Sequence, residues 1–364
     1  MGLESLKLCV QLLVVGVICL CPIAGAQQID QSPAEQTSTT PFSNSVPNLS
    51  STDVFPHIEE DYSTPAIASG TELIPQRPLP LESDDFASFH REILRVEWRR
   101  GDSIDLYIVK PLKVSKPPVV LYLYSYPYEM DRFRDSNFCD FLVQNGVAAV
   151  AFPSALTATR YRTGRPMKEW FVSELPESLA TTAHDVQMIL NYLGERGDLD
   201  MNHVGVFGDG SGATIAILAA AVDPRIKALD LLDPWGDWPD WVAKTTRIPD
   251  RERPNFLKPE WLAKVAPLDP LVWLPKLNTP KIRIRLIKDV TVTPAEIQDK
   301  IAATAPSNAL IVNFKNSAEF QASVAQGNGF DWIKQQVRVG SGKEYHAAHR
   351  PPAKSSATAL RSSQ

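Results

Sequence analysis

Short apolar runs recur along the central part of the chain and alternate with segments of helical periodicity. A continuous apolar run, typical of a strand buried on both faces, occurs at residues 119–124, and further strands are predicted at 147–152, 204–207, 226–232, 282–287 and 309–314. Helical spacing of apolar positions occurs at 135–144, 178–193, 295–303 and 330–337. This alternation predicts an α/β fold, in which a mostly parallel sheet is covered by helices on both faces.

The predicted domain begins with an antiparallel pair of strands. Residues 93–98 and 104–109 have strand-like composition, and turn residues at 100–102 separate them. Regular structure is therefore expected to start near Phe86. Asp135 is the expected N-cap of the first helix, because its side chain can accept a hydrogen bond from a free backbone N–H.

Both ends of the chain lack sustained periodicity. Residues 27–82 are acidic and rich in Ser, Thr, Pro and Gln, and residues 339–364 are basic. Segments of this kind bury too little apolar surface to offset the entropy lost on ordering. The sequence therefore predicts a disordered spacer, an α/β domain at 83–338 and a disordered tail.

The first 26 residues have the pattern of a secretory signal. Lys7 precedes an apolar run at 8–20, and Ala24-Gly25-Ala26 matches a small-residue cleavage site. Because a bilayer span needs about 20 apolar residues, no stable membrane span is expected once this segment is removed. The sequence thus predicts a secreted or periplasmic protein that is cleaved after Ala26.

Composition narrows the possible partners and cofactors. A net charge of -5 gives no reason to expect a nucleic acid as partner. No clustered Cys, His and carboxylate spacing suggests a metal, and nothing requires an organic cofactor. Cys139 is the one cysteine left after signal removal, and it is expected to be a small buried residue on a helix.

A glycine-dense corner lies between a predicted strand and an alanine-rich helix at residues 204–221. Such a corner is how a nucleophile elbow, with the spacing G-x-S-x-G, is built. Gly208 and Gly212 fall on the two flanking glycines, and Gly210 falls on the central position, where serine is expected.

The order of elements and the residues at 203–213 resemble the α/β-hydrolase fold, in particular secreted esterases and prolyl-oligopeptidase-like peptidases. Residues 267–270, which read Pro-Leu-Asp-Pro, are similar to the segment that leads into the penultimate strand of these proteins. The resemblance covers roughly Arg91 to Val337. It implies a serine nucleophile, then an acid, then a histidine, in that order along the chain.

The nucleophile and acid positions of this triad differ in how well they are filled. Gly210 has no side chain with which to attack. Asp289 ends the penultimate predicted strand and is the candidate acid, with Asp233 as a substitute.

The histidine position is not filled. The family places this residue after the last strand, and the loop at 315–328 contains no histidine. His346 and His349 follow only in the basic tail, where nothing is expected to hold them in triad geometry.

Three interpretations follow from the incomplete triad. The favoured one is a non-catalytic relative that keeps the fold and uses its pocket to bind a small-molecule ligand or a partner, because nucleophile and base are both missing. The second is an active esterase or peptidase that uses Ser211 through a one-residue shift of the elbow. The third takes Asp209 as a carboxylate nucleophile, as in the dehalogenase branch, and it too would need a histidine.

Aromatic residues suggest where a ligand could be bound. Trp235 and Trp238 lie in a tryptophan-rich insertion that is expected to form a cap. Packing of the cap is the simpler explanation, and an aromatic ligand-binding surface is the alternative. Tyr126 and Tyr128, which follow a predicted strand, are further candidates for lining the pocket.

Overall fold

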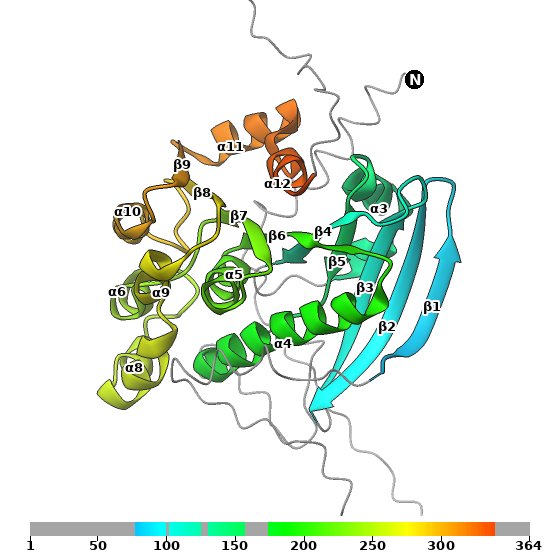
Figure 1. The fold of residues 1–364 in the computed structure, drawn as a ribbon. Coiled ribbons are helices and arrows are strands. Elements are labelled where there is room, and N and C mark those ends of the chain that lie inside the picture. The colour runs from blue at the N-terminus through cyan, green and yellow to red at the C-terminus, as the bar shows by residue number, and fades with distance from the viewer. Residues whose placement is uncertain (1–76, 100–101, 125–129, 157–173, 339–364) are drawn as a thin grey trace, which may run out of the picture.

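A nine-stranded sheet runs through the part of the chain that the computed structural model describes, namely residues 77–99, 102–124, 130–156 and 174–338 (Figure 1). Its strand order is β1-β2-β3-β5-β4-β6-β7-β8-β9. The strands are β1 (Leu79–Asp85), β2 (Phe89–Arg99), β3 (Asp102–Pro111), β4 (Pro118–Leu123), β5 (Ala148–Ala151), β6 (Asp200–Asp209), β7 (Ile226–Leu232), β8 (Lys281–Ile287) and β9 (Ala309–Phe314).

The sheet is mostly parallel, as the sequence predicts. Strands β5, β4, β6, β7, β8 and β9 pair in parallel, and β1, β2 and β3 form an antiparallel extension that joins β5. The predicted antiparallel pair is therefore confirmed as β2 and β3. Strand β1 starts at Leu79, ahead of the predicted start near Phe86. Its residues are exposed or half-buried, so the strand carries no apolar run that would reveal it.

The predicted helices are present, and further short ones appear. The α-helices are α3 (Ser136–Val143), α4 (Leu175–Arg196), α5 (Ser211–Val222), α6 (Trp238–Lys244), α7 (Arg253–Phe256), α8 (Pro259–Val265), α9 (Pro270–Trp273), α10 (Ala295–Thr304), α11 (Ser317–Ser323) and α12 (Asp331–Val337). Asp135 caps α3 by accepting a hydrogen bond from the N–H of Asn137 at 2.8 Å, as predicted. Within the described ranges, no helix combines the length and apolarity needed to cross a bilayer.

Two apolar cores lie on opposite faces of the sheet. Helices α4 and α5 cover one face together with the segment between β7 and β8, and α3 and α12 cover the other (Figure 1). Cys139 lies on α3 in the second core, where it is fully buried as predicted. Burial raises the pKa of its thiol to about 12, which leaves it protonated and inert at neutral pH.

The segment between β7 and β8 forms the tryptophan-rich cap and contains helices α6 to α9. Trp235, Trp238 and Trp241 are each at most 1% exposed, and the rings of Trp235 and Trp241 stack with their centroids 4.9 Å apart. The carboxylate of Asp269 accepts hydrogen bonds from the N–H groups of Asp237 and Trp238, both at 3.1 Å. The tryptophans thus pack the cap onto the domain.

Close approach of helices to the sheet depends on glycines. A Cβ at Gly205 would lie 2.6 Å from Cγ1 of Val337, so α12 rests directly on β6 there. A Cβ at Gly212 would collide with the carbonyl oxygen of Leu123, the last residue of β4. Backbone cannot yield as a flexible side chain can, so Gly212 is the more restrictive of the two.

Replacing Gly212 with alanine should therefore lower the free energy of unfolding by about 3 kcal/mol, because α5 must move away from β4. Urea denaturation with the midpoint and slope fitted separately measures this cost. Gly194→Ala is the matched control, since it lies in α4 with no atom within 4 Å of its added Cβ. This control should be neutral or slightly stabilising. Equal stability of the two variants would contradict the packing argument.

Candidate functional site

The corner between β6 and α5 has a sharply turned backbone with glycine at its centre. Gly210 has φ 54° and ψ −113°, a conformation that a residue with a side chain adopts only with strain. Its N–H donates to the carbonyl oxygen of Leu232 at 2.8 Å, which ties the corner to the end of β7. A Cβ at Gly208 would lie 2.5 Å from Cα of Ala213, so this glycine too is required for the tight turn.

Ser211 is the first residue of α5 and lies directly after the corner. Its exposed fraction is 0%. The residue that holds the strained corner geometry is therefore Gly210, and Ser211 lies one position into the helix.

Asp289 lies beyond the end of β8 and is exposed. Its carboxylate accepts two hydrogen bonds from Ser317, one from the backbone N–H at 2.9 Å and one from the hydroxyl at 2.8 Å. Ser317 begins α11, which follows the last strand. The candidate acid is thus brought to the segment where the resemblance implies a histidine, and a serine hydroxyl is its partner there. Apart from the missing histidine, nothing in the sequence pointed to Ser317.

Asp233, the substitute candidate for the acid, follows β7 in a left-handed conformation with φ 42°. Its carboxylate accepts a hydrogen bond from the N–H of Ile287 at 2.9 Å, and its own N–H donates to the carbonyl oxygen of Arg285 at 2.9 Å. Burial raises the pKa of Asp233 well above its usual value. This carboxyl therefore braces the ends of β7 and β8.

Strand register places four residues in one row across the carboxyl ends of β4, β6, β7 and β8. The four residues are Tyr124, Asp209, Leu232 and Arg285. Asp209 pairs with Leu232, and Leu232 pairs with Arg285. Tyr124 lies beside Asp209, because the residues before them, Leu123 and Gly208, form a pair. Paired residues of a sheet point to the same face. The row faces α12, and the fold thereby collects polar groups that are far apart in the sequence.

Asp209 is the last residue of β6 and is only 8% exposed. Burial raises the pKa of its carboxyl to about 6, although the nearby guanidiniums of Arg132, Arg285 and Arg247 act in the opposite direction. Its carboxylate accepts no hydrogen bond from the residues that the structure describes. A carboxyl with a raised pKa at the carboxyl edge of a parallel sheet makes Asp209 a candidate functional residue.

A buried ion network lies directly below this row. The carboxylate of Asp230 is paired with Arg283 at 2.7 Å and with Arg285 at 3.1 Å. Arg285 also donates to the carbonyl oxygen of Gly329 at 3.2 Å, which ties the chain ahead of α12 to the sheet. Burial lowers the pKa of Arg285 to about 10, so its guanidinium stays charged at neutral pH.

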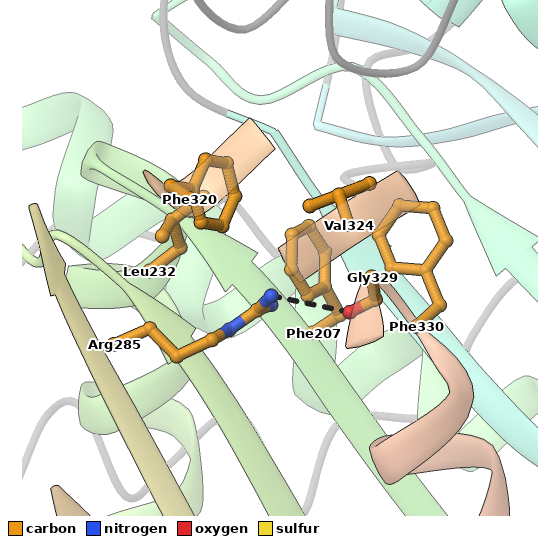
Figure 2. A pocket seen from close by; sticks show the side chains of 7 residues that line it. All are labelled: Phe207, Leu232, Arg285, Phe320, Val324, Gly329 and Phe330. Atoms are coloured by element: carbon orange, nitrogen blue, oxygen red, sulfur yellow. Dashed lines mark hydrogen bonds between the residues drawn. The ribbon is translucent and has the colours of Figure 1, made fainter. Parts of the chain in front are cut away.

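A small cavity adjoins Arg285 and is otherwise walled mainly by aromatic and aliphatic side chains (Figure 2). Its lining residues are Phe207, Leu232, Arg285, Phe320, Val324, Gly329 and Phe330. The volume of about 10 Å³ is at the lower limit for one water molecule. Phe320 and Val324 come from α11 and a π-helical turn, η6 (Val324–Asn328), so the segment after the last strand roofs the cavity.

The remaining candidates lie apart from this row or outside the described residues. Trp235 and Trp238 are in the core of the cap, whereas Tyr126 and Tyr128 fall in a part of the chain that is not described. His203 pairs with Asp200 at 2.7 Å, at the opposite end of β6 from the elbow. Among the described residues, no group of three or more His, Cys, Asp and Glu could hold a metal ion.

Replacing Asp209 with asparagine should change how stability depends on pH. The pKa of Asp209 is raised to about 6, so its contribution to stability is complete below about pH 4 and is lost as pH rises through about 6. The variant cannot ionise at this position and so does not show this loss. The difference in free energy of unfolding, variant minus wild type, should therefore increase by up to about 3 kcal/mol between pH 4 and 7. Urea denaturation across this range measures the difference.

Asp250→Asn, at a side chain 96% exposed, is the matched surface control for this measurement. Parallel pH profiles of wild type and Asp209→Asn would contradict the assignment of the titrating group.

Comparison with known proteins gives similarity in structure without similarity in sequence. No protein-family model and no curated protein sequence matches the chain. Among solved structures, an acetyl xylan esterase from Thermoanaerobacterium sp. JW/SL YS485 is similar over 70% of this chain and 86% of its own. It has 16% identity and a TM-score of 0.56.

Two other solved structures give the same result. An acetyl xylan esterase from Paenibacillus sp. R4 covers 72% of this chain and 92% of its own, with 14% identity and a TM-score of 0.57. An S-formylglutathione hydrolase from Agrobacterium tumefaciens covers 71% and 100%, with 10% identity and a TM-score of 0.54. Structural similarity at sequence identities this low shows a shared fold but does not show a shared activity. Together with the strand order and the glycine corner, they establish that this chain has the α/β-hydrolase fold.

Proposed function

We propose that this protein is a non-catalytic relative of the hydrolases of this fold and that it binds a ligand at the carboxyl edge of its sheet. The observation that carries the proposal is the conformation of Gly210. The strained corner of the elbow, where a nucleophile must project, is occupied by a residue without a side chain.

The surroundings of the other triad positions support the same proposal. Ser211 would have to reach the corner from a position that is 0% exposed. Asp289 meets the hydroxyl of Ser317, and a serine hydroxyl does not take up a proton near neutral pH as an imidazole does. The described residues therefore supply neither a nucleophile at the corner nor a base beside Asp289. The loss of either one alone removes most triad catalysis.

Features of the carboxyl edge support a binding role. Ligands of open parallel sheets bind outside the carboxyl ends of the strands, where Asp209 and Arg285 lie here. Together with the predicted secretory signal at 1–26, this suggests a binding protein that works outside the cytoplasm.

The test is a hydrolase assay of the chain from Gln27, the predicted start of the mature protein. We expect no turnover of short or long acyl esters or of peptide anilides above the buffer rate, and no mass increase with a fluorophosphonate that modifies nucleophilic serines. Wild type, Ser211→Ala and the surface control Ser307→Ala should behave alike. Thermal unfolding verifies that all three are folded.

A different pattern would overturn the non-catalytic role. If Ser211→Ala lowers turnover by about a thousandfold or more while Ser307→Ala does not, Ser211 is the nucleophile of an active hydrolase. Turnover that both variants retain would also contradict the proposal, and a loss confined to Asp209→Asn would assign the attack to that carboxylate.

A further inference from the structure

Two buried polar groups in the row at the carboxyl edge donate to no acceptor among the residues that the structure describes. They are the hydroxyl of Tyr124 and Nε of Arg285, and the two residues are 4% and 2% exposed. Burial of such groups without a partner is unfavourable, and native proteins rarely leave them so. An acceptor supplied by another molecule would satisfy them.

The two groups belong to one place in the fold. The ring of Tyr124 lies with its centroid 5.9 Å from that of Phe207 on β6, and Cζ of Arg285, on β8, lies 5.5 Å from the same Phe207 centroid. Asp209 follows Phe207 by two residues and points to the same face. The unpartnered donors therefore flank a single buried carboxyl.

Guanidiniums outnumber carboxylates around this carboxyl. Arg132 stacks on the ring of Tyr124 with Cζ 4.4 Å from its centroid. Neither Arg132 nor Arg247 forms an ion pair with a carboxylate in the described segments, and Arg285 shares Asp230 with Arg283. Four guanidiniums and three carboxyls make up the cluster: Arg132, Arg247, Arg283, Arg285, Asp209, Asp230 and Asp233. Lys288, which also acts on Asp233, is paired with Asp299 at 2.7 Å. The cluster thus has an excess of positive charge even with every carboxyl ionised.

We propose that this cluster binds the oxyanion group of a small ligand, a carboxylate or a phosphate, through the guanidiniums of Arg132 and Arg285 and the hydroxyl of Tyr124. Guanidinium forks match the geometry of both groups. The N-terminus of α5, a helix of 12 residues, points to the same edge and adds positive potential. This proposal rests on the binding role proposed above and names the chemistry of its ligand.

The size of the cavity limits how the ligand is placed. With a volume of about 10 Å³, the space beside Arg285 takes at most one atom the size of a water oxygen. The exposed lining of this space is apolar, so the charged oxygens of the bound group lie outside it, at the edge of the sheet.

Binding of an anion next to Asp209 should depend on pH. The groups that face Asp209 are Arg132 from the 3-10 helix η2 (Met130–Arg134), Tyr124 after β4, Asp233 after β7, Arg247 after α6 and Arg285 on β8. A bound anion repels the ionised carboxylate and favours its protonated form, so binding takes up a proton. Affinity for the oxyanion should therefore rise as pH falls through about 6.

The experiment is calorimetric titration of the mature chain at pH 6 with benzoate and with inorganic phosphate, at constant ionic strength set by sodium chloride. Benzamide, which matches benzoate in shape but carries no charge, should not bind. Tyr124→Phe should weaken oxyanion binding about tenfold with little loss of thermal stability, because the Tyr124 hydroxyl donates to no acceptor in the described segments. Arg132→Gln should weaken it at least as much.

The matched control is Arg95→Gln, which removes a guanidinium paired with Asp105 on the distant β2–β3 hairpin and should leave the affinity unchanged. Between pH 7 and 5.5, benzoate affinity should rise several-fold in wild type and stay constant in Asp209→Asn. The relative affinities of benzoate and phosphate tell which oxyanion the site prefers.

The proposal is overturned if neither oxyanion binds at millimolar concentration, if benzamide binds as well as benzoate, or if Tyr124→Phe and Arg132→Gln bind like wild type. These outcomes are separate from those of the hydrolase assay. Turnover that depends on Ser211 would remove the non-catalytic role and leave oxyanion binding intact, whereas absent binding would leave the turnover result unchanged.

Discussion

The close approach of α5 to the sheet is the constraint on which the rest of this structure depends. The helix can leave β6 at a sharp angle only because Gly208 and Gly212 have no Cβ to collide with Ala213 and Leu123, and because Gly210 accepts a left-handed backbone. The glycine spacing of the elbow is thus a packing requirement as well as a catalytic one. A chain of this fold can retain it after the nucleophile is gone, so the spacing alone is no proof of chemistry.

The second determining feature is charge buried on the face of the sheet that α12 covers. Asp230 holds Arg283 and Arg285 together, and Arg285 reaches the carbonyl oxygen of Gly329. A buried pair of this kind adds little net stability, since desolvation offsets much of its attraction, but breaking it leaves an uncompensated buried charge. Here it fixes the segment ahead of α12 over the carboxyl edge, and it places a guanidinium next to Asp209.

Most of the fold could be predicted from sequence, because its causes are local. Apolar runs and strand-like composition identified β4 to β9, and helical periodicity identified α3, α4, α10 and α12. The capping chemistry of Asp135 needed only neighbouring residues. Strand β1 escaped prediction because its residues are exposed or half-buried, so it has no apolar pattern. Helix α11 and the cap helices are short, and tertiary packing rather than propensity stabilises helices of that length.

Some features of the candidate site could likewise be predicted from the sequence, and others could not. The sequence by itself determined that a glycine stands at the centre of the elbow and that no histidine follows the last strand before the tail. Only the tertiary structure decided that Asp289 meets Ser317 and that Tyr124, Asp209 and Arg285 share one row. The physical reason is strand register: it brings residues from four strands together, and no local pattern in the chain encodes which side chains become neighbours.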